Sequence, residues 1–110
     1  MLKTLLNLGF KQRNAEVYVF LALNGIHTAS DIAKATGTHK RQVYIALKKM
    51  KDLKIVSGSK EMPAHFSAMP FDKLLDFLIK SNLEEANRIE KDKEDLLALW
   101  NSTFKEKHAN

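Results

Sequence analysis

Residues 28–52 decide the fold, and they read TASDIAKATGTHKRQVYIALKKMKD. Thr28 is a typical helix N-cap, and Asp31 stands three residues further on, where its carboxylate reaches the cap amide and complements the helix dipole. Gly37 ends this short helix, and Thr38 is the next N-cap residue. Two helices separated by a short turn with a glycine are the signature of a helix-turn-helix.

The second helix of the pair is predicted to run from about His39 to Asp52. Its apolar residues recur at the spacing of one buried helix face and form a single stripe: Val43, Ala46, Leu47 and Met50. Most of its other positions are basic. Fifteen consecutive residues hold six cations, opposed only by Asp52: Lys40, Arg41, Lys48, Lys49, Lys51 and Lys54. This helix is therefore expected to bury an aliphatic seam and to turn a cationic face to solvent.

The segments on either side complete the domain. Residues 12–23 have the apolar periodicity of another buried-face helix, which Asn24-Gly25 ends. Residues 55–57 and 64–68 are short β-compatible segments, joined by a loop that contains Gly and Pro. An isolated hairpin is unstable in water, so this one must pack against the helices. The order of elements predicts a winged helix-turn-helix over residues 1–69, mainly α with a small β-hairpin.

Residues 70–110 are predicted to form a long helix that dimerises. Pro70 suits a helix start, and residues 71–104 contain no further Gly or Pro, which corresponds to about 50 Å of helix. Both ends are apolar, whereas residues 84–95 are mostly charged. Such a helix cannot bury both ends against one small domain, so a coiled-coil-like homodimer is expected. The predicted interface consists of Leu75, Leu78, Ile79, Ala86, Ile89, Leu96, Leu97, Trp100 and Phe104.

The charged middle of this helix also bears on how the two copies pair. No strict heptad repeat persists through residues 84–95, which favours an antiparallel or end-paired contact over a uniform parallel zipper. The alternative within one chain is a fold-back helical hairpin, but no turn signal lies near the midpoint.

The net charge divides between the two halves of the chain. Residues 1–60 carry eleven Lys or Arg and three Asp or Glu, for a net +8, whereas residues 61–110 carry seven and ten, for −3. A basic half indicates a polyanionic partner. The absence of cysteine excludes disulfide scaffolds and thiol catalysis, and no apolar run is long enough to span a membrane. We expect a cytoplasmic, nucleoid-associated protein.

Several segments taken together carry a family resemblance. They are Leu8-Gly9-Phe10, Ala15–Tyr18, Leu21–Leu23, Thr28–Gly37, Val43-Tyr44 with Leu47 and Met50, Ile55-Val56 and Ala64–Pro70. In this order they resemble the winged-helix domain of the archaeal TrmB-like transcriptional regulators over about residues 5–80. Lys54 departs from the pattern, because such domains commonly have a glycine between recognition helix and wing. The resemblance covers the DNA-binding domain alone, and with the chain ending at Asn110 we expect no sugar-sensing domain.

The helix-turn-helix arrangement predicts which residues meet double-stranded DNA. The first residues of the second helix reach base edges in the major groove, where Arg suits guanine and Gln suits adenine. The predicted base contacts are His39, Lys40, Arg41, Gln42 and Ile45. The predicted phosphate contacts are Thr28, Ser30, Tyr44, Lys48, Lys49, Lys51, Lys54, Ser59 and Lys60. For Arg41 and Gln42 the alternative is phosphate contact or plain solvation, and for Ile45 it is packing on the first helix.

Enzymatic function has little support in this sequence. The four histidines are scattered without metal-ligand spacing, and no nucleophile elbow, phosphate-binding loop or dinucleotide fingerprint is present. We expect no metal and no cofactor, and the sequence indicates no particular small-molecule effector. The predicted function is that of a dimeric, sequence-specific transcription regulator. Two alternatives stay open: an architectural protein that coats DNA with little sequence preference, and a winged helix used as a protein-interaction module.

Overall fold

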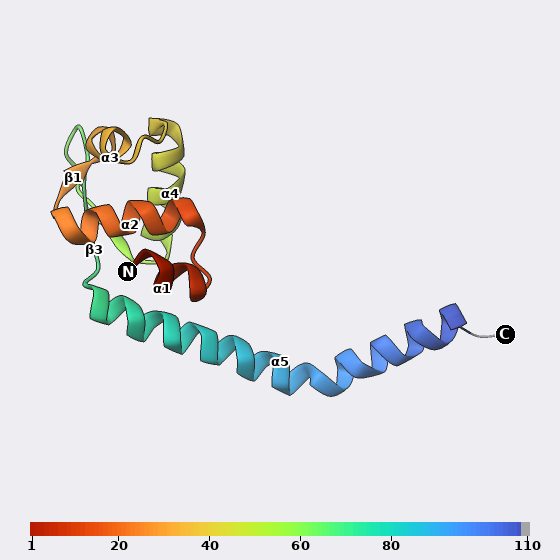
Figure 1. The fold of residues 1–110 in the computed structure, drawn as a ribbon. Coiled ribbons are helices and arrows are strands. Elements are labelled where there is room, and N and C mark those ends of the chain that lie inside the picture. Colours follow the sequence, from red (N-terminus) through yellow and green to blue (C-terminus); the bar gives the residue numbers. More distant parts are fainter. Residues whose placement is uncertain (109–110) are drawn as a thin grey trace. The chain divides into compact units, whose positions relative to one another are not determined.

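The computed structural model describes residues 1–108 and has the predicted architecture, a helical domain with a small sheet followed by a long helix (Figure 1). Backbone contacts divide the chain into two units, one over Met1–Asp76 and one that begins at Phe77. The elements in chain order are α1 (Leu2–Asn7), α2 (Gln12–Asn24), β1 (His27–Thr28), α3 (Ala29–Thr36), α4 (Lys40–Asp52), β2 (Val56–Gly58), β3 (His65–Ala68) and α5 (Phe71–His108).

Helix α2 is the centre of the first unit, because it packs against α1, α3, α4 and β3. Its buried face consists of Ala15, Val17, Tyr18 and Leu21, none of which is more than 2% exposed. The stripe predicted for α4 is buried to the same degree, with Val43, Ala46, Leu47 and Met50 at most 2% exposed. Burying this seam fixes which side of α4 faces solvent.

Helix α3 begins and ends where the sequence predicts. Thr28 caps α3 in a capping box: its hydroxyl accepts a hydrogen bond from the Asp31 amide at 3.2 Å, and the Asp31 carboxylate accepts one from the Thr28 amide at 3.3 Å. Gly37 ends α3 with φ of 68°, the left-handed conformation that glycine adopts without strain. The helix-turn-helix is thus confirmed with its predicted start and break.

The sheet differs from the predicted two-stranded hairpin, because it has three antiparallel strands in the order β1-β3-β2. His27 and Thr28 pair with Phe66 and His65 of β3, and Val56 pairs with Ala68 on the other side. The added strand β1 has two residues, too few to show an alternating pattern, and it leads directly into the α3 cap. Because β3 pairs with β2 on one side and with β1 on the other, the sheet connects the wing to the start of the helix-turn-helix.

One helix was not predicted, and two helix ends differ from prediction. The apolar stretch before Gly9 forms a helix, α1. Helix α4 begins at Lys40 with His39 as its N-cap, so the prediction that Thr38 caps it is wrong: the His39 carbonyl accepts the first intrahelical bonds. Helix α5 continues past Phe104 to His108, and the basic residues of its last turn complement the negative end of the helix dipole.

The backbone of Lys54 explains how a lysine can stand where related domains commonly have a glycine. Lys54 has φ of 64°, so it adopts the left-handed conformation that favours glycine, although it has a side chain. The chain therefore enters β2 with the backbone geometry a glycine would give. The strain of a non-glycine residue there is of the order of 1 kcal/mol.

Tyr18 joins the core to the residues just before α5. Its side chain is fully buried, and its hydroxyl donates a hydrogen bond to the Met69 carbonyl at 2.5 Å. Burial raises the pKa of the Tyr18 hydroxyl above its usual value of 10.0, and the nearby Asp72 carboxylate raises it further. Both effects disfavour the phenolate in the folded chain.

Tyr18→Phe should lower the free energy of unfolding by about 1 kcal/mol at neutral pH, because one hydrogen bond is lost. A group whose pKa is raised on folding contributes its full stabilisation below its unfolded pKa, here about 10. This contribution is lost as the pH rises through the pKa of the folded chain. Wild-type stability should therefore fall more steeply above pH 10 than that of Tyr18→Phe. Urea denaturation across this range measures both effects. Tyr44→Phe, which removes an exposed hydroxyl, is the control at neutral pH.

Candidate nucleic-acid interface

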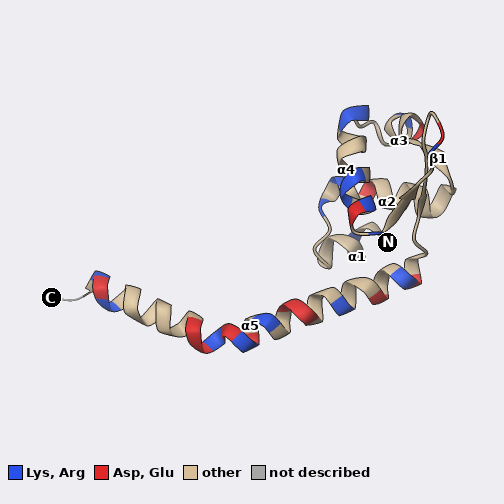
Figure 2. Cartoon of the chain, turned by 180° about the vertical axis from the view of Figure 1, so that it is seen from behind, with Lys and Arg blue, Asp and Glu red and all other residues tan. Residues whose placement is uncertain are grey.

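Helix α4 carries basic residues near both of its ends (Figure 2). Opposite the buried seam lie Arg41, Ile45 and Lys48, all exposed, and Ile45 is 55% exposed. Tyr44 and Lys49 flank this line and are also exposed. More than half of the Ile45 surface is thus open to solvent.

The cations of this side have no internal partners. Within residues 1–108, no carboxylate lies within 4.0 Å of the charged nitrogen of the six predicted cations: Lys40, Arg41, Lys48, Lys49, Lys51 and Lys54. A face of unpaired cations produces a positive potential that attracts a polyanion. Asp52, one turn beyond Lys48, is the acid of this stretch.

One flank of α4 meets the wing. The Tyr44 ring packs edge-on against Phe66 of β3 with ring centroids 6.5 Å apart, and the Lys40 ammonium lies 5.9 Å from the Tyr44 ring centroid. Lys51 approaches the wing at Gly58, where an added Cβ would lie 3.5 Å from the Lys51 Nζ and 3.1 Å from the Phe66 ring. The wing and the cationic face of α4 therefore form one continuous surface.

The other flank of α4 meets α2. The Arg13 guanidinium donates a hydrogen bond from Nη1 to Gln42 Oε1 at 3.0 Å, and Gln42 is only partly exposed. Arg13 was not among the predicted site residues. Its position in the sequence is nevertheless unusual, because it places a cation in the first turn of α2, where the helix dipole disfavours positive charge.

Two predicted phosphate contacts already hold hydrogen bonds within the chain. The Thr28 amide is occupied by the Asp31 carboxylate, which stands at the α3 N-terminus where a phosphate would bind. Ser59 closes the wing loop: its hydroxyl accepts a hydrogen bond from the His65 amide at 2.9 Å. Ser30 is partly exposed, and Lys60 is exposed.

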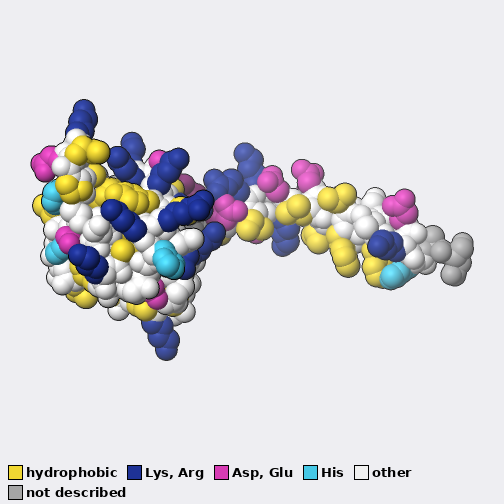
Figure 3. Space-filling view, turned by 90° about the horizontal axis from the view of Figure 1, so that it is seen from above, with side chains coloured by type: hydrophobic (Ala, Val, Ile, Leu, Met, Phe, Trp, Pro, Cys, Tyr) yellow, Lys and Arg dark blue, Asp and Glu magenta, His cyan; other side chains and the backbone are white. Residues whose placement is uncertain are grey.

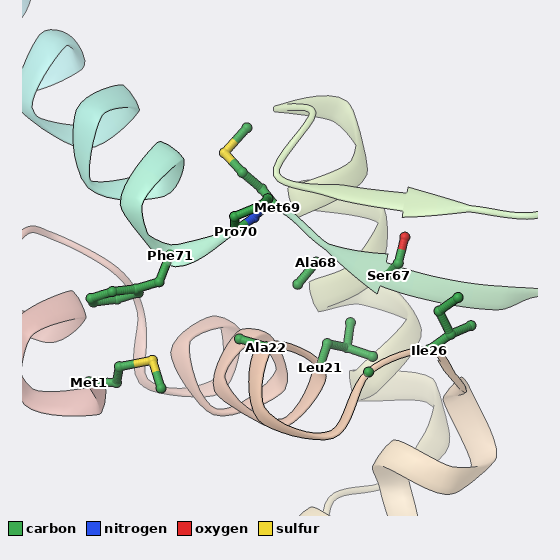
Figure 4. A pocket seen from close by; sticks show the side chains of 10 residues that line it. Met1, Leu21, Ala22, Ile26, Ser67, Ala68, Met69, Pro70 and Phe71 are labelled. Atoms are coloured by element: carbon green, nitrogen blue, oxygen red, sulfur yellow. The ribbon is translucent and has the colours of Figure 1, made fainter.

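An apolar pocket of about 320 Å³ opens beside β3 and the start of α5 (Figure 4). Leu21 and Ile26 line one side, and Ala68, Met69 and Phe71 line another. None of its lining residues has a charged side chain. Across residues 1–108, no three His, Asp or Glu side chains gather in a way that could hold a metal ion.

Helix α5 has an uncovered apolar stripe beyond Asp76 (Figure 3). At about 100° per residue, the nine predicted interface residues share an arc of about 100°. Ile79, Ile89, Leu96 and Trp100 on this stripe are 52–61% exposed, whereas Leu78 is only 8% exposed. Near the end of the helix, the Trp100 and Phe104 rings lie with their centroids 5.9 Å apart and their planes tilted by 38°. No helix in the described part of the chain is long and apolar enough to cross a bilayer.

Three helices, a small antiparallel sheet and a basic recognition helix define a winged helix-turn-helix DNA-binding protein. The family model described as "sugar-specific transcriptional regulator TrmB" matches residues 5–72. The chain belongs to this family, and its winged helix is the part that the family model covers. It is a transcription regulator of the DNA-binding winged-helix class.

Solved structures support the same fold. A possible transcriptional regulator from Methanosarcina mazei Go1 aligns with a TM-score of 0.66 at 11% identity, over 84% of this chain and 83% of that one. The YusO protein from Bacillus subtilis aligns with a TM-score of 0.56 at 15% identity, over 99% of this chain and 82% of that one.

A shorter match has higher identity. The Zalpha domain of Carassius auratus PKZ, solved in complex with Z-DNA, is 31% identical over 53% of this chain and 94% of that one, with a TM-score of 0.51. No curated protein matches the chain in sequence. The matched family is one of transcriptional regulators, and the Methanosarcina mazei protein is described as a possible transcriptional regulator.

Proposed function

We propose that this chain is a homodimeric regulator that reads a specific sequence in double-stranded DNA, with α4 in the major groove and the β2–β3 hairpin as the wing. Residues 1–69 bind DNA and residues 70–110 dimerise. The observation that carries the proposal is the exposed side of α4, where five cations without carboxylate partners lie on the helix above its buried seam and Lys54 follows just beyond its end. A regulator that binds double-stranded DNA in this way associates with chromosomal DNA in the cell.

The side chains of α4 divide between two tasks in this proposal. Arg41 and Ile45 lie on the outermost line near the start of the helix, where a helix-turn-helix reads bases, and Lys40 and His39 precede them. Lys48, Lys49, Lys51 and Lys54 lie towards its C-terminal end and neutralise phosphates. Base contacts give sequence preference, and phosphate contacts give affinity and register.

The dimer rests on the uncovered stripe of α5. Trp100 is 61% exposed and Ile79 is 59% exposed, so each copy leaves large apolar surfaces in water unless a second copy covers them. Lys93 interrupts the stripe at its charged middle, which disfavours a uniform parallel zipper. We therefore propose an antiparallel or end-paired contact, in which the Trp100–Phe104 end of one copy meets the Leu75–Ile79 end of the other.

Selection from random duplexes tests the proposal. A dimer with two recognition helices should enrich a two-fold symmetric site whose half-sites lie about one helical turn apart. Enrichment of no sequence, together with tight binding to any duplex, would support the architectural alternative instead. Failure to bind duplex DNA at low ionic strength would leave the protein-interaction alternative.

A second candidate is binding to left-handed DNA, favoured by the 31% identity to a domain solved with Z-DNA. Circular dichroism distinguishes the two candidates. If the chain recognises Z-DNA, adding it to an alternating dC-dG duplex should invert the spectrum of the DNA. If it reads right-handed DNA, the duplex should keep its B-form spectrum while fluorescence anisotropy reports binding.

A further inference from the structure

The hydrogen bond between Arg13 and Gln42 fixes the orientation of one predicted base-reading side chain. Arg13 lies in the first turn of α2 and Gln42 in the first turn of α4, 29 residues further along the chain. A guanidinium has only donors, so the Gln42 amide must turn its oxygen towards Arg13. This settles which end of the amide is oxygen and which is nitrogen.

The orientation changes what Gln42 reads. Glutamine recognises adenine through two hydrogen bonds, in which Oε1 accepts from N6 and Nε2 donates to N7 at one base edge. With one lone pair of Oε1 engaged by Arg13 of α2, a bidentate contact with adenine requires Oε1 to share or release that bond. The Nε2 group remains free and only donates. It suits guanine, whose O6 and N7 are both acceptors, or thymine O4, whereas adenine places the N6 donor beside its N7 acceptor.

We propose that Arg13 is a positioning residue that determines base specificity through Gln42, directing it to guanine or thymine rather than to the adenine expected from the sequence. The proposal rests on the proposed sequence-specific binding and assigns a residue outside α4 to that site. Arg13 itself need not touch a base.

No ion pair within residues 1–108 accounts for the cation at this position. Arg13 is exposed, and no carboxylate within residues 1–108 lies within 4.0 Å of its guanidinium. The helix dipole disfavours a positive charge in the first turn of a helix. Arg13 therefore costs α2 some stability, and its hydrogen bond to Gln42 of α4 is the contact that offsets this cost.

Selection from random duplexes with four variants tests the proposal: Arg13→Ala, Gln42→Ala, the double variant, and Lys11→Ala as a control that removes a neighbouring exposed cation. Gln42→Ala identifies the base pair that Gln42 reads, since preference there should disappear. At that base pair the wild-type chain should enrich guanine or thymine. Arg13→Ala should shift the preference towards adenine by about tenfold. The double variant should match Gln42→Ala at this position.

Two results would overturn the proposal while the proposed function stands. One is a wild-type site with adenine at the base pair that Gln42 reads. The other is an Arg13→Ala chain that loses affinity for all sequences alike, as Lys11→Ala should, with an unchanged site. A wild-type chain that enriches no sequence would overturn the proposed function, and the specificity role with it.

A measurement without DNA tests the hydrogen bond itself. In ¹H–¹⁵N spectra of the free protein, the side-chain amide signals of Gln42 should move in Arg13→Ala and stay in place in Lys11→Ala. Unchanged Gln42 signals in Arg13→Ala would contradict the positioning role, whatever sequence the chain prefers.

Discussion

Reversing two charges on the outermost line of α4, with Arg41→Glu and Lys48→Glu together, should lower affinity for the selected duplex by about a thousandfold or more. Each substitution removes a favourable contact worth about 1–3 kcal/mol and adds repulsion from a phosphate. Both side chains are exposed on the side opposite the buried seam, so the free energy of unfolding should change little. Fluorescence anisotropy at two salt concentrations measures the loss and the change in salt dependence.

The control must change the net charge equally elsewhere. Lys3→Glu with Lys73→Glu does so, because both lysines are exposed and lie in the first turns of α1 and α5, where an acidic residue favours the helix dipole. This pair should weaken binding only through the overall charge, by less than about tenfold at moderate salt. Equal losses from both pairs would show that net charge, and not the face of α4, governs binding.

The sequence was most informative where one element carries its own pattern. The stripe of α4 repeats at helical spacing, and the Thr28 and Gly37 signals are local, so the helix-turn-helix could be predicted from neighbouring residues alone. Strand β1 was missed because two residues cannot show a period, and its pairing partner Phe66 lies far along the chain. Local patterns give elements, whereas pairing between distant segments requires the three-dimensional structure.

In the candidate site, too, the sequence indicates which residue types are present, whereas their contacts require the structure. The sequence located the cations of α4, but whether they are paired depends on carboxylates from every other element. The same holds for predicted ligands that turned out to be occupied: Ser59 closes the wing loop, and the Thr28 amide bonds to Asp31. Arg13 could not be linked to Gln42 from the sequence, because a contact between two helices depends on how they cross.

Trp100→Glu should convert the proposed dimer into a monomer, weakening self-association by about a hundredfold or more. A large aromatic residue on an interface stripe typically contributes more than 2 kcal/mol, and a glutamate there also has to be desolvated. Sedimentation equilibrium over a range of protein concentrations measures the change. Because Trp100 is 61% exposed in the single chain, the substitution should leave the fold of the first unit intact, which circular dichroism checks.

The neighbouring residue supplies a matched control. Leu99 is 65% exposed, about as much as Trp100, but it is turned by about 100° around the helix and lies outside the stripe. Leu99→Glu adds the same charge at nearly the same place along α5 and should leave the dimer unchanged. Monomerisation by both variants would show that charge near the end of α5, and not the stripe, controls self-association. In the monomer formed by Trp100→Glu, binding to a duplex with two half-sites should fall to that of one half-site, because the second recognition helix is no longer linked to the first.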